Sequence, residues 1–317
     1  MNAAVVHDYS APPRYETFDD PVPKEGERLV RVSAAGLHPL VKAVASGRHY
    51  SSSGVLPMVP GSDGVGRLED GSRVYFAATR PPYGSMAERS VTRAWLPIPE
   101  SPDDATVAAM MNPGMSSFGA LTQRIEFAKG ESILILGATG SAGQLAVQIA
   151  KRLGARRVVG AGRDAEALEE TKRLGADATI SLKQEHEALV AALREEIAGQ
   201  KIDVVLDYVW GAPAEAALEA IAARGRDLAS RRIRYVEVGA MAGPTISLPA
   251  ATLRSSGLEM VGSGLGSVPM EKILRALSLF VAEAAREPFE IKTATAPLRE
   301  VERRWNERSE ARLVLQP

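Results

Sequence analysis

The pattern of apolar and polar positions changes twice along the 317 residues of the chain. In the first third, short apolar or alternating runs such as 28–36 and 86–99 are separated by clusters of proline, glycine and aspartate, which is typical of strands joined by turns. From about residue 101, apolar runs alternate with amphipathic stretches of helical period. After residue 268, one long helical stretch leads to a short apolar strand at the end. The tail therefore resembles the start more than the middle.

The pattern of apolar and polar residues in the middle of the chain predicts a parallel sheet. Each buried strand there is followed by an amphipathic helix, and such a series places neighbouring strands parallel, with helices on both faces. The length of the chain is greater than one ordinary core requires, and it suggests two domains. We therefore predict an α/β fold with two domains, one of which is built on a doubly wound parallel sheet.

A glycine-rich turn stands between the first strand of this series and its helix, in the stretch "ILILGATGSAGQLAVQ". Its spacing is G-x-x-G-x-x-G, a variant of the dinucleotide-binding fingerprint. The first glycine permits the tight turn, the second leaves bare backbone for a pyrophosphate, and the third lets helix and strand pack closely. Because the turn has strand–turn–helix context, we predict a dinucleotide site. Its residues here are Gly137, Thr139, Gly140, Ser141, Ala142 and Gly143.

The end of the second strand of the series bears on the choice between NADH and NADPH. A site for NAD usually has an acidic residue there, which binds the ribose hydroxyls. This chain has Gly162 followed by Arg163, and an arginine can pair with a 2′-phosphate. Asp164 could be the acidic residue displaced by two positions, or it could cap the following helix. We favour the cap, and therefore predict that NADPH is the cofactor.

Charge and composition exclude several classes of function. The formal net charge is −1, so no basic excess points to nucleic acid or to an anionic membrane surface. The chain has no cysteine, which removes disulfides, thiolate metal ligands and thiol nucleophiles. No apolar run approaches the length of about 18 residues that spans a bilayer, and the first residues do not resemble a signal peptide. We expect a cytoplasmic protein.

The chain resembles the medium-chain dehydrogenase/reductase superfamily, and within it the zinc-free quinone oxidoreductase branch. The stretches that carry the resemblance, in this order, include "VRVSAAGLHPL", "VPGSDGVG", "GSMAE", "LILGATGSAGQLAVQIAKRLGA" and "LVLQP". The resemblance implies a GroES-like β-barrel catalytic domain, 1–118 with 268–317, around an inserted Rossmann domain, 119–267. It also implies a homodimer and hydride transfer from NADPH to a quinone or a conjugated enone or enal.

The same resemblance argues against a catalytic metal. Zinc alcohol dehydrogenases of the superfamily have a cysteine at the position of His38 and a His-Glu pair at the positions of Ser62 and Asp63. A set of His38, His49 and Asp63 would contain legitimate zinc ligands, but its spacing matches no pattern that we can name. We predict no bound metal.

The catalytic residues are predicted from the chemistry of the acceptor. Hydride transfer to a quinone or enone builds negative charge on oxygen, which a hydroxyl, an imidazole N–H or a backbone amide can stabilise. We predict Tyr50 first, then His49 and His38, with Tyr83 a weaker choice. The quinone reductase branch usually has Asn at position 38 and often Asp at position 41, where this chain has His and Val.

Further cofactor contacts are predicted at the nicotinamide end. By resemblance, Asn112 and Ser117 lie beside the nicotinamide. Ligands of such sheets bind outside the carboxyl ends of the strands, so we add the residues that follow two later strands: Gly239, Ala240, Ser263 and Leu265. Two other functions stay open: an NADPH-binding redox-sensing or structural protein without turnover, and a zinc alcohol dehydrogenase, against which the lost ligands argue.

Overall fold

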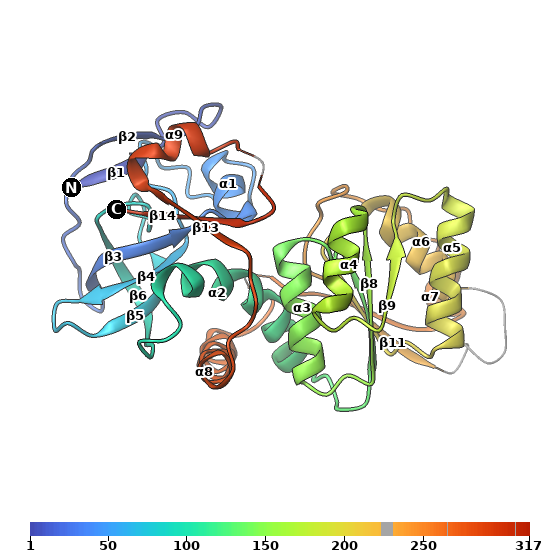
Figure 1. The fold of residues 1–317 in the computed structure, drawn as a ribbon. Helices are drawn as coiled ribbons and strands as arrows, with labels where there is room; N and C mark the ends of the chain where they lie inside the picture. Colours follow the sequence, from blue (N-terminus) through green and yellow to red (C-terminus); the bar gives the residue numbers. More distant parts are fainter. Residues whose placement is uncertain (223–230, 265, 308) are drawn as a thin grey trace. The chain divides into compact units, whose positions relative to one another are not determined.

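The computed structural model describes residues 1–222, 231–264, 266–307 and 309–317, and these form two compact units (Figure 1). The first unit comprises Met1–Pro113 with Val281–Pro317, and the second comprises Gly114–Phe280. The chain ends thus share a unit. The unit limits differ from the boundaries 118/119 and 267/268 expected from the sequence, which remain a prediction about domains.

The first unit is built on an antiparallel barrel. Strand β3 pairs with both β4 and β6, and β5 joins β4 to β6, so that the four strands close on themselves. Val30, Val32, Val74 and Phe76 point inward and form a small buried core. The bounds are β3 Arg28–Gly36, β4 Asp63–Leu68, β5 Arg73–Thr79 and β6 Arg89–Pro97.

The C-terminal tail extends this sheet. Strand β14 pairs antiparallel with the end of β3, through Val314 opposite Gly36 and Leu315 opposite Ala35, and it pairs parallel with β13. This pairing explains why the tail has the same pattern as the start. The remaining elements of the unit are β1 Asn2–Val5, β2 Arg14–Thr17, α1 Pro39–Ala45, β13 Thr293–Pro297, η3 Leu298–Glu300, α9 Val301–Arg304 and β14 Arg312–Gln316.

The second unit holds a six-stranded, wholly parallel sheet of order β12-β11-β10-β7-β8-β9. The strand order reverses direction at β7, which lies between β10 and β8. The carboxyl ends of β7 and β10 are therefore the topological switch point, where ligands bind in such sheets. The bounds are β7 Ser132–Leu136, β8 Arg157–Gly162, β9 Ala178–Ser181, β10 Val204–Asp207, β11 Arg232–Glu237 and β12 Gly257–Gly262.

Helices cover both faces of the parallel sheet. In Figure 1, α3 and α4 lie on one face and α5 and α6 on the other, and β7 is buried along its whole length between them. These helices are α3 Ser141–Arg152, α4 Ala165–Arg173, α5 His186–Arg194 with η2 Glu195–Gly199, α6 Gly211–Ile221 and α7 Ala250–Arg254.

Two longer helices, α2 Asp104–Gly119 and α8 Met270–Arg286, pass through the limits of the units, and η1 Ala120–Arg124 follows α2. Within the described ranges, no helix is both long and apolar enough to cross a bilayer. The predicted fold class is confirmed, because a doubly wound parallel sheet is inserted between the two parts of a barrel-containing unit.

Candidate cofactor site and active site

The glycine turn after β7 has the geometry that a dinucleotide site requires. Gly137 has φ +87°, a conformation that L side chains rarely adopt, and a Cβ atom there would meet Val209 Cγ1 at 3.0 Å. A Cβ atom at Gly143 would collide with the Gly137 carbonyl oxygen and with the backbone of Ala138. A Cβ atom at Gly140 would meet nothing closer than 3.7 Å. Gly137 and Gly143 are therefore required by the fold, whereas Gly140 leaves open space.

The open space at Gly140 lies at the start of α3. Gly140 is the N-cap of this helix, and no side chain caps it. The first backbone N–H groups of a helix have no intrahelical acceptor, and the helix dipole favours an anion there. Thr139, Ser141 and Ala142 belong to the same turn and first helical positions. The turn therefore offers free amides and bare backbone where a pyrophosphate would bind.

The end of β8 lacks a free acidic residue. Asp164 is the N-cap of α4, and its Oδ1 accepts a hydrogen bond from the Ala167 amide at 2.9 Å. The preferred interpretation of Asp164 as a helix cap is thus confirmed. Gly162 is buried against the Thr139 side chain. Arg163 is exposed, and within the described residues its guanidinium makes no ion pair. A free arginine beside an occupied aspartate suits a phosphate better than a ribose hydroxyl.

Tyr208 belongs to the same edge of the sheet and was missed by sequence reasoning. It follows β10 directly, and its own Cβ atom lies close to the glycine turn, 3.2 Å from where a Cβ atom added to Gly137 would stand. Its hydroxyl is 3.1 Å from Ser116 Oγ, and burial raises its pKa to about 12, so the hydroxyl stays protonated. The signal in the sequence is its place directly after a buried strand of the parallel series, next to the switch point.

The predicted contacts at the nicotinamide end have different environments. Gly239 follows β11, and its amide donates to the Asp207 carbonyl at 3.2 Å, so it belongs to the switch-point edge. Ser263 follows β12 and donates its amide to the Glu237 carbonyl at 2.8 Å. Ser117 is buried, and its hydroxyl donates to the Gly114 carbonyl within α2. Ala240 is exposed beside Gly239. Leu265 lies outside the described residues.

A second cluster of polar side chains is buried in the first unit, around Asp63. Oδ1 of this carboxylate accepts from Ser62 Oγ at 2.8 Å and from Asn112 Nδ2 at 3.3 Å, and Oδ2 accepts from the Tyr75 hydroxyl at 3.0 Å. Burial raises the pKa of Asp63 to about 6, although the three donors oppose that shift. Asn112, predicted beside the nicotinamide, is thus a partner of Asp63.

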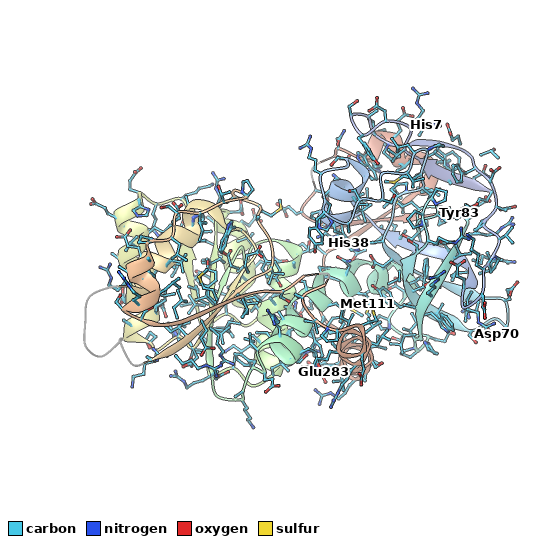
Figure 2. All side chains as sticks on the ribbon, turned by 180° about the vertical axis from the view of Figure 1, so that it is seen from behind. His7, His38, Asp70, Tyr83, Met111 and Glu283 are labelled. Carbon is cyan, nitrogen blue, oxygen red and sulfur yellow. The ribbon has the colours of Figure 1, made fainter. Side chains whose placement is uncertain are left out.

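His38 lies next to this cluster, at the N-terminus of α1 (Figure 2). Only 1% of the residue is exposed. Its Nε2 is 3.9 Å from Asp63 Oδ2, and neither ring nitrogen has a hydrogen-bond partner of good geometry. Burial, together with the positive charge of Arg312, lowers the pKa of His38 to about 3. The imidazole is therefore neutral near pH 7, and its role as a donor to substrate oxygen stays a prediction.

The cluster fits hydrogen bonding better than metal binding. Three donors already occupy the two oxygens of Asp63. Burial raises the pKa of Tyr75 well above its usual value, so this hydroxyl remains a donor and not an anionic ligand. In the part of the chain that the structure describes, no group of three His, Cys, Asp or Glu side chains could hold a metal ion. Independence from zinc stays a prediction.

His49 and Tyr50 lie in an environment unlike that of His38. They follow α1 in a loop, where their rings are tilted against each other with centroids 4.1 Å apart. Tyr50 is 72% exposed, and His49 Nδ1 is 2.6 Å from Ser51 Oγ. Tyr83, the weaker choice, packs against Phe18 and beneath the guanidinium of Arg80. Tyr50 is thus largely exposed, whereas the Tyr83 ring is in contact with neighbouring side chains; the catalytic role of each stays a prediction.

Comparison with known proteins places these features in a family. The model of the zinc-binding dehydrogenase family matches residues 142–282. A probable NADPH-dependent quinone reductase of Emericella nidulans, tdiC, is 29% identical over the whole length of both chains. Prostaglandin reductase-3 of Bos taurus is 31% identical over 65% of this chain, which spans 55% of that protein. Quinone oxidoreductase of Thermus thermophilus, solved alone and with NADPH, is 26% identical with a TM-score of 0.81, and the match covers all of both chains.

Together, the parallel sheet with its glycine turn and the barrel-containing unit made from both chain ends define a dehydrogenase or reductase of the medium-chain type. These comparisons support the medium-chain dehydrogenase/reductase superfamily, as the sequence predicted. Within the superfamily, they support the quinone oxidoreductase-like branch.

Proposed function

We propose that this protein is an NADPH-dependent oxidoreductase that transfers hydride to a quinone or to a conjugated enone or enal, without zinc. One observation carries the choice of cofactor: Asp164 is held as a helix cap, so the end of β8 presents the free guanidinium of Arg163. The names of several relatives, an NADPH-dependent quinone reductase and an NADPH-dependent alkenal/one oxidoreductase of Arabidopsis thaliana among them, support the acceptor class.

Different residues of the second unit would bind different parts of NADPH. The amides at the start of α3 and the open backbone at Gly140 would hold the pyrophosphate, and Arg163 would pair with the 2′-phosphate. Bound NADPH supplies the hydride, so the protein has to position the two reactants and stabilise charge. Backbone groups of Gly239, Ala240 and Ser263, at the carboxyl edge of the sheet, are the proposed contacts at the nicotinamide end.

The first unit supplies the candidates for polarising the acceptor. Hydride addition at carbon leaves negative charge on the acceptor oxygen, which a hydrogen-bond donor lowers in energy. We propose Tyr50 as this donor, because the residue is largely exposed, with His49 beside it. His38 is neutral and buried, so it retains one N–H that can donate after a local rearrangement.

The test is NADPH consumption by purified, chelator-treated protein that is offered a simple quinone and a simple enone in parallel. Turnover with either acceptor supports metal-free hydride transfer and selects between the two acceptor classes. NADPH binding without turnover of any acceptor in a broad panel would support the alternative, a redox-sensing or structural protein that binds NADPH. Turnover that is lost with the chelator and restored by zinc would refute zinc independence.

The assembly is also part of the proposal. Strand β12 is an edge of the parallel sheet, with Gly257–Gly262 paired on one side only in the described chain. We expect a homodimer in which two such edges join. Light scattering after size-exclusion chromatography would give twice the mass of the chain, and a monomer at micromolar concentration would refute this assembly.

A further inference from the structure

The first unit contains a pocket of about 230 Å³ that the function proposed above does not use. It lies among residues of α1, β13, β14 and the segment that follows α9. Part of its wall is apolar, from Leu37, Ala294, Ala311 and Leu313. The rest of the wall is mainly charged and contains three basic side chains, Lys42, Arg304 and Arg312, and one acidic one, Glu307.

The charges in this wall do not balance. Arg304 is fully engaged, because its guanidinium donates to Glu300 at 3.2 Å and to Glu307 at 2.7 Å. No carboxylate of the described residues lies within ion-pair distance of Lys42 or Arg312. Asp63 attracts Arg312 only through space. Two cations thus face the pocket without a counter-ion, and the acidic group beside them is already bound to Arg304.

Arg312 is also short of hydrogen-bond acceptors. One Nη atom donates to the Leu37 carbonyl at 3.1 Å, whereas Nε is buried and has no acceptor. Burial lowers the pKa of Arg312, and burial together with the charge of Arg312 lowers the pKa of Lys42. Arg312 is partly buried, and a charge that is removed from water normally has a partner that compensates it. An anion in the pocket would supply that compensation to both cations.

We propose that this pocket binds a short-chain organic acid, with its carboxylate between Lys42 and Arg312 and its carbon chain against Leu37 and Leu313. Arginine favours planar, bidentate anions such as carboxylates. The apolar part of the wall favours an organic acid over a hydrated inorganic ion. A volume of about 230 Å³ leaves room for a small organic acid.

An organic acid of this size could come from two sources. It could be an unsaturated acid that is itself the hydride acceptor, or a saturated acid that binds without reacting. But-2-enoate and butanoate separate these sources, because both have six non-hydrogen atoms and only the first has a conjugated double bond. Butanamide is the uncharged isostere of butanoate, and it tests the need for a negative charge.

The experiment is calorimetric titration of the full chain with each compound at constant ionic strength, for the native protein and for Lys42→Gln and Lys24→Gln. Lys24 is an exposed lysine of the same unit outside the pocket, so its variant is matched in charge and in residue type. We expect both acids to bind and butanamide not to bind. Lys42→Gln should weaken acid binding about tenfold, from the loss of one charge-assisted contact, and Lys24→Gln should leave it unchanged.

Each result has a definite meaning. NADPH oxidation that depends on but-2-enoate would assign the pocket to the acceptor, and binding without oxidation would assign it to a non-reacting acid; both support the proposal. Absence of binding of both acids at millimolar concentration overturns it. Equal binding by the two lysine variants, or equal binding of butanamide, also overturns it. Arg312→Lys, which keeps the charge but loses the planar fork, should weaken binding of both acids without abolishing it.

Discussion

The buried pair of His38 and Asp63 predicts an unusual dependence of stability on pH. Folding raises the pKa of Asp63 from 3.8 to about 6, so this group stabilises the folded protein below pH 3.8, and that contribution is lost as pH rises through 6. Folding lowers the pKa of His38 from 6.5 to about 3, so its contribution is present above pH 6.5 and is lost as pH falls towards 3. Between pH 4 and 6, the two contributions therefore change in opposite directions.

The magnitudes follow from the pKa values of the two groups. On going from pH 7.5 to pH 5, the protonation of Asp63 adds about 1 kcal/mol to the free energy of unfolding. Over the same interval, His38 removes about 2 kcal/mol, because the unfolded imidazole takes up a proton that the buried one refuses. Burial is the main cause of both pKa shifts, so removing one group should leave the contribution of the other in place.

The variant Asp63→Asn removes one of the opposing contributions. Between pH 7.5 and pH 5, we expect the free energy of unfolding of Asp63→Asn to fall by about 1 kcal/mol more than that of the native protein. The free energy of unfolding of His38→Asn should fall by less than that of the native protein. Urea unfolding at the two pH values measures these differences, with Asp19→Asn, at an exposed carboxylate without an ion pair in the described chain, as the control. The reasoning would be refuted if the free energy of unfolding changed equally between the two pH values in the native protein and in Asp63→Asn.

Three further predictions concern the second unit. Arg163→Ala should weaken NADPH binding about tenfold and leave NADH binding unchanged, as fluorescence titration can measure; equal effects on the two cofactors would contradict the 2′-phosphate contact. Gly140→Ala should fold normally but bind NADPH more weakly, whereas Gly143→Ala should lower the thermal midpoint strongly, because only the second Cβ collides with backbone. Tyr208→Phe should lower the free energy of unfolding by about 1 kcal/mol through loss of the bond to Ser116; an unchanged value in urea unfolding would mean that this bond contributes nothing.

The parallel sheet was predictable because its signals are local. Each buried strand carries its own apolar run, and the helix that follows carries its own period and cap, so Asp164 could be assigned as a cap from its neighbours alone. The glycine turn is also marked locally, since Gly137 has a positive φ and a Cβ atom at Gly143 would collide with the backbone of Gly137 and Ala138. Such features need no knowledge of distant pairing.

The polar cluster of the first unit was not predictable in the same way. Asp63 could be singled out, but Tyr75 and Asn112 reach it from 12 and 49 residues away, and nothing in their local sequence marks them as partners. The pocket beside Arg312 brings together residues from both ends of the chain. Leu37 and Arg312, which are hydrogen-bonded to each other there, are 275 residues apart in the sequence. The sequence identified candidate residue types but could not separate the buried His38 from the exposed Tyr50, because exposure depends on how the barrel closes.

The cluster around Asp63 explains how the barrel-containing unit accommodates buried polar side chains without a cation. A buried carboxylate without compensation is costly, and here Ser62, Tyr75 and Asn112 supply hydrogen bonds in place of a cation. His38 makes no such bond and is accommodated by remaining neutral. Introducing a cysteine at position 38 alone would thus not recreate a metal site, because the oxygens of Asp63 would have to give up their donors first. The predicted independence from zinc would therefore depend on the whole hydrogen-bonded cluster and not on the loss of any single ligand.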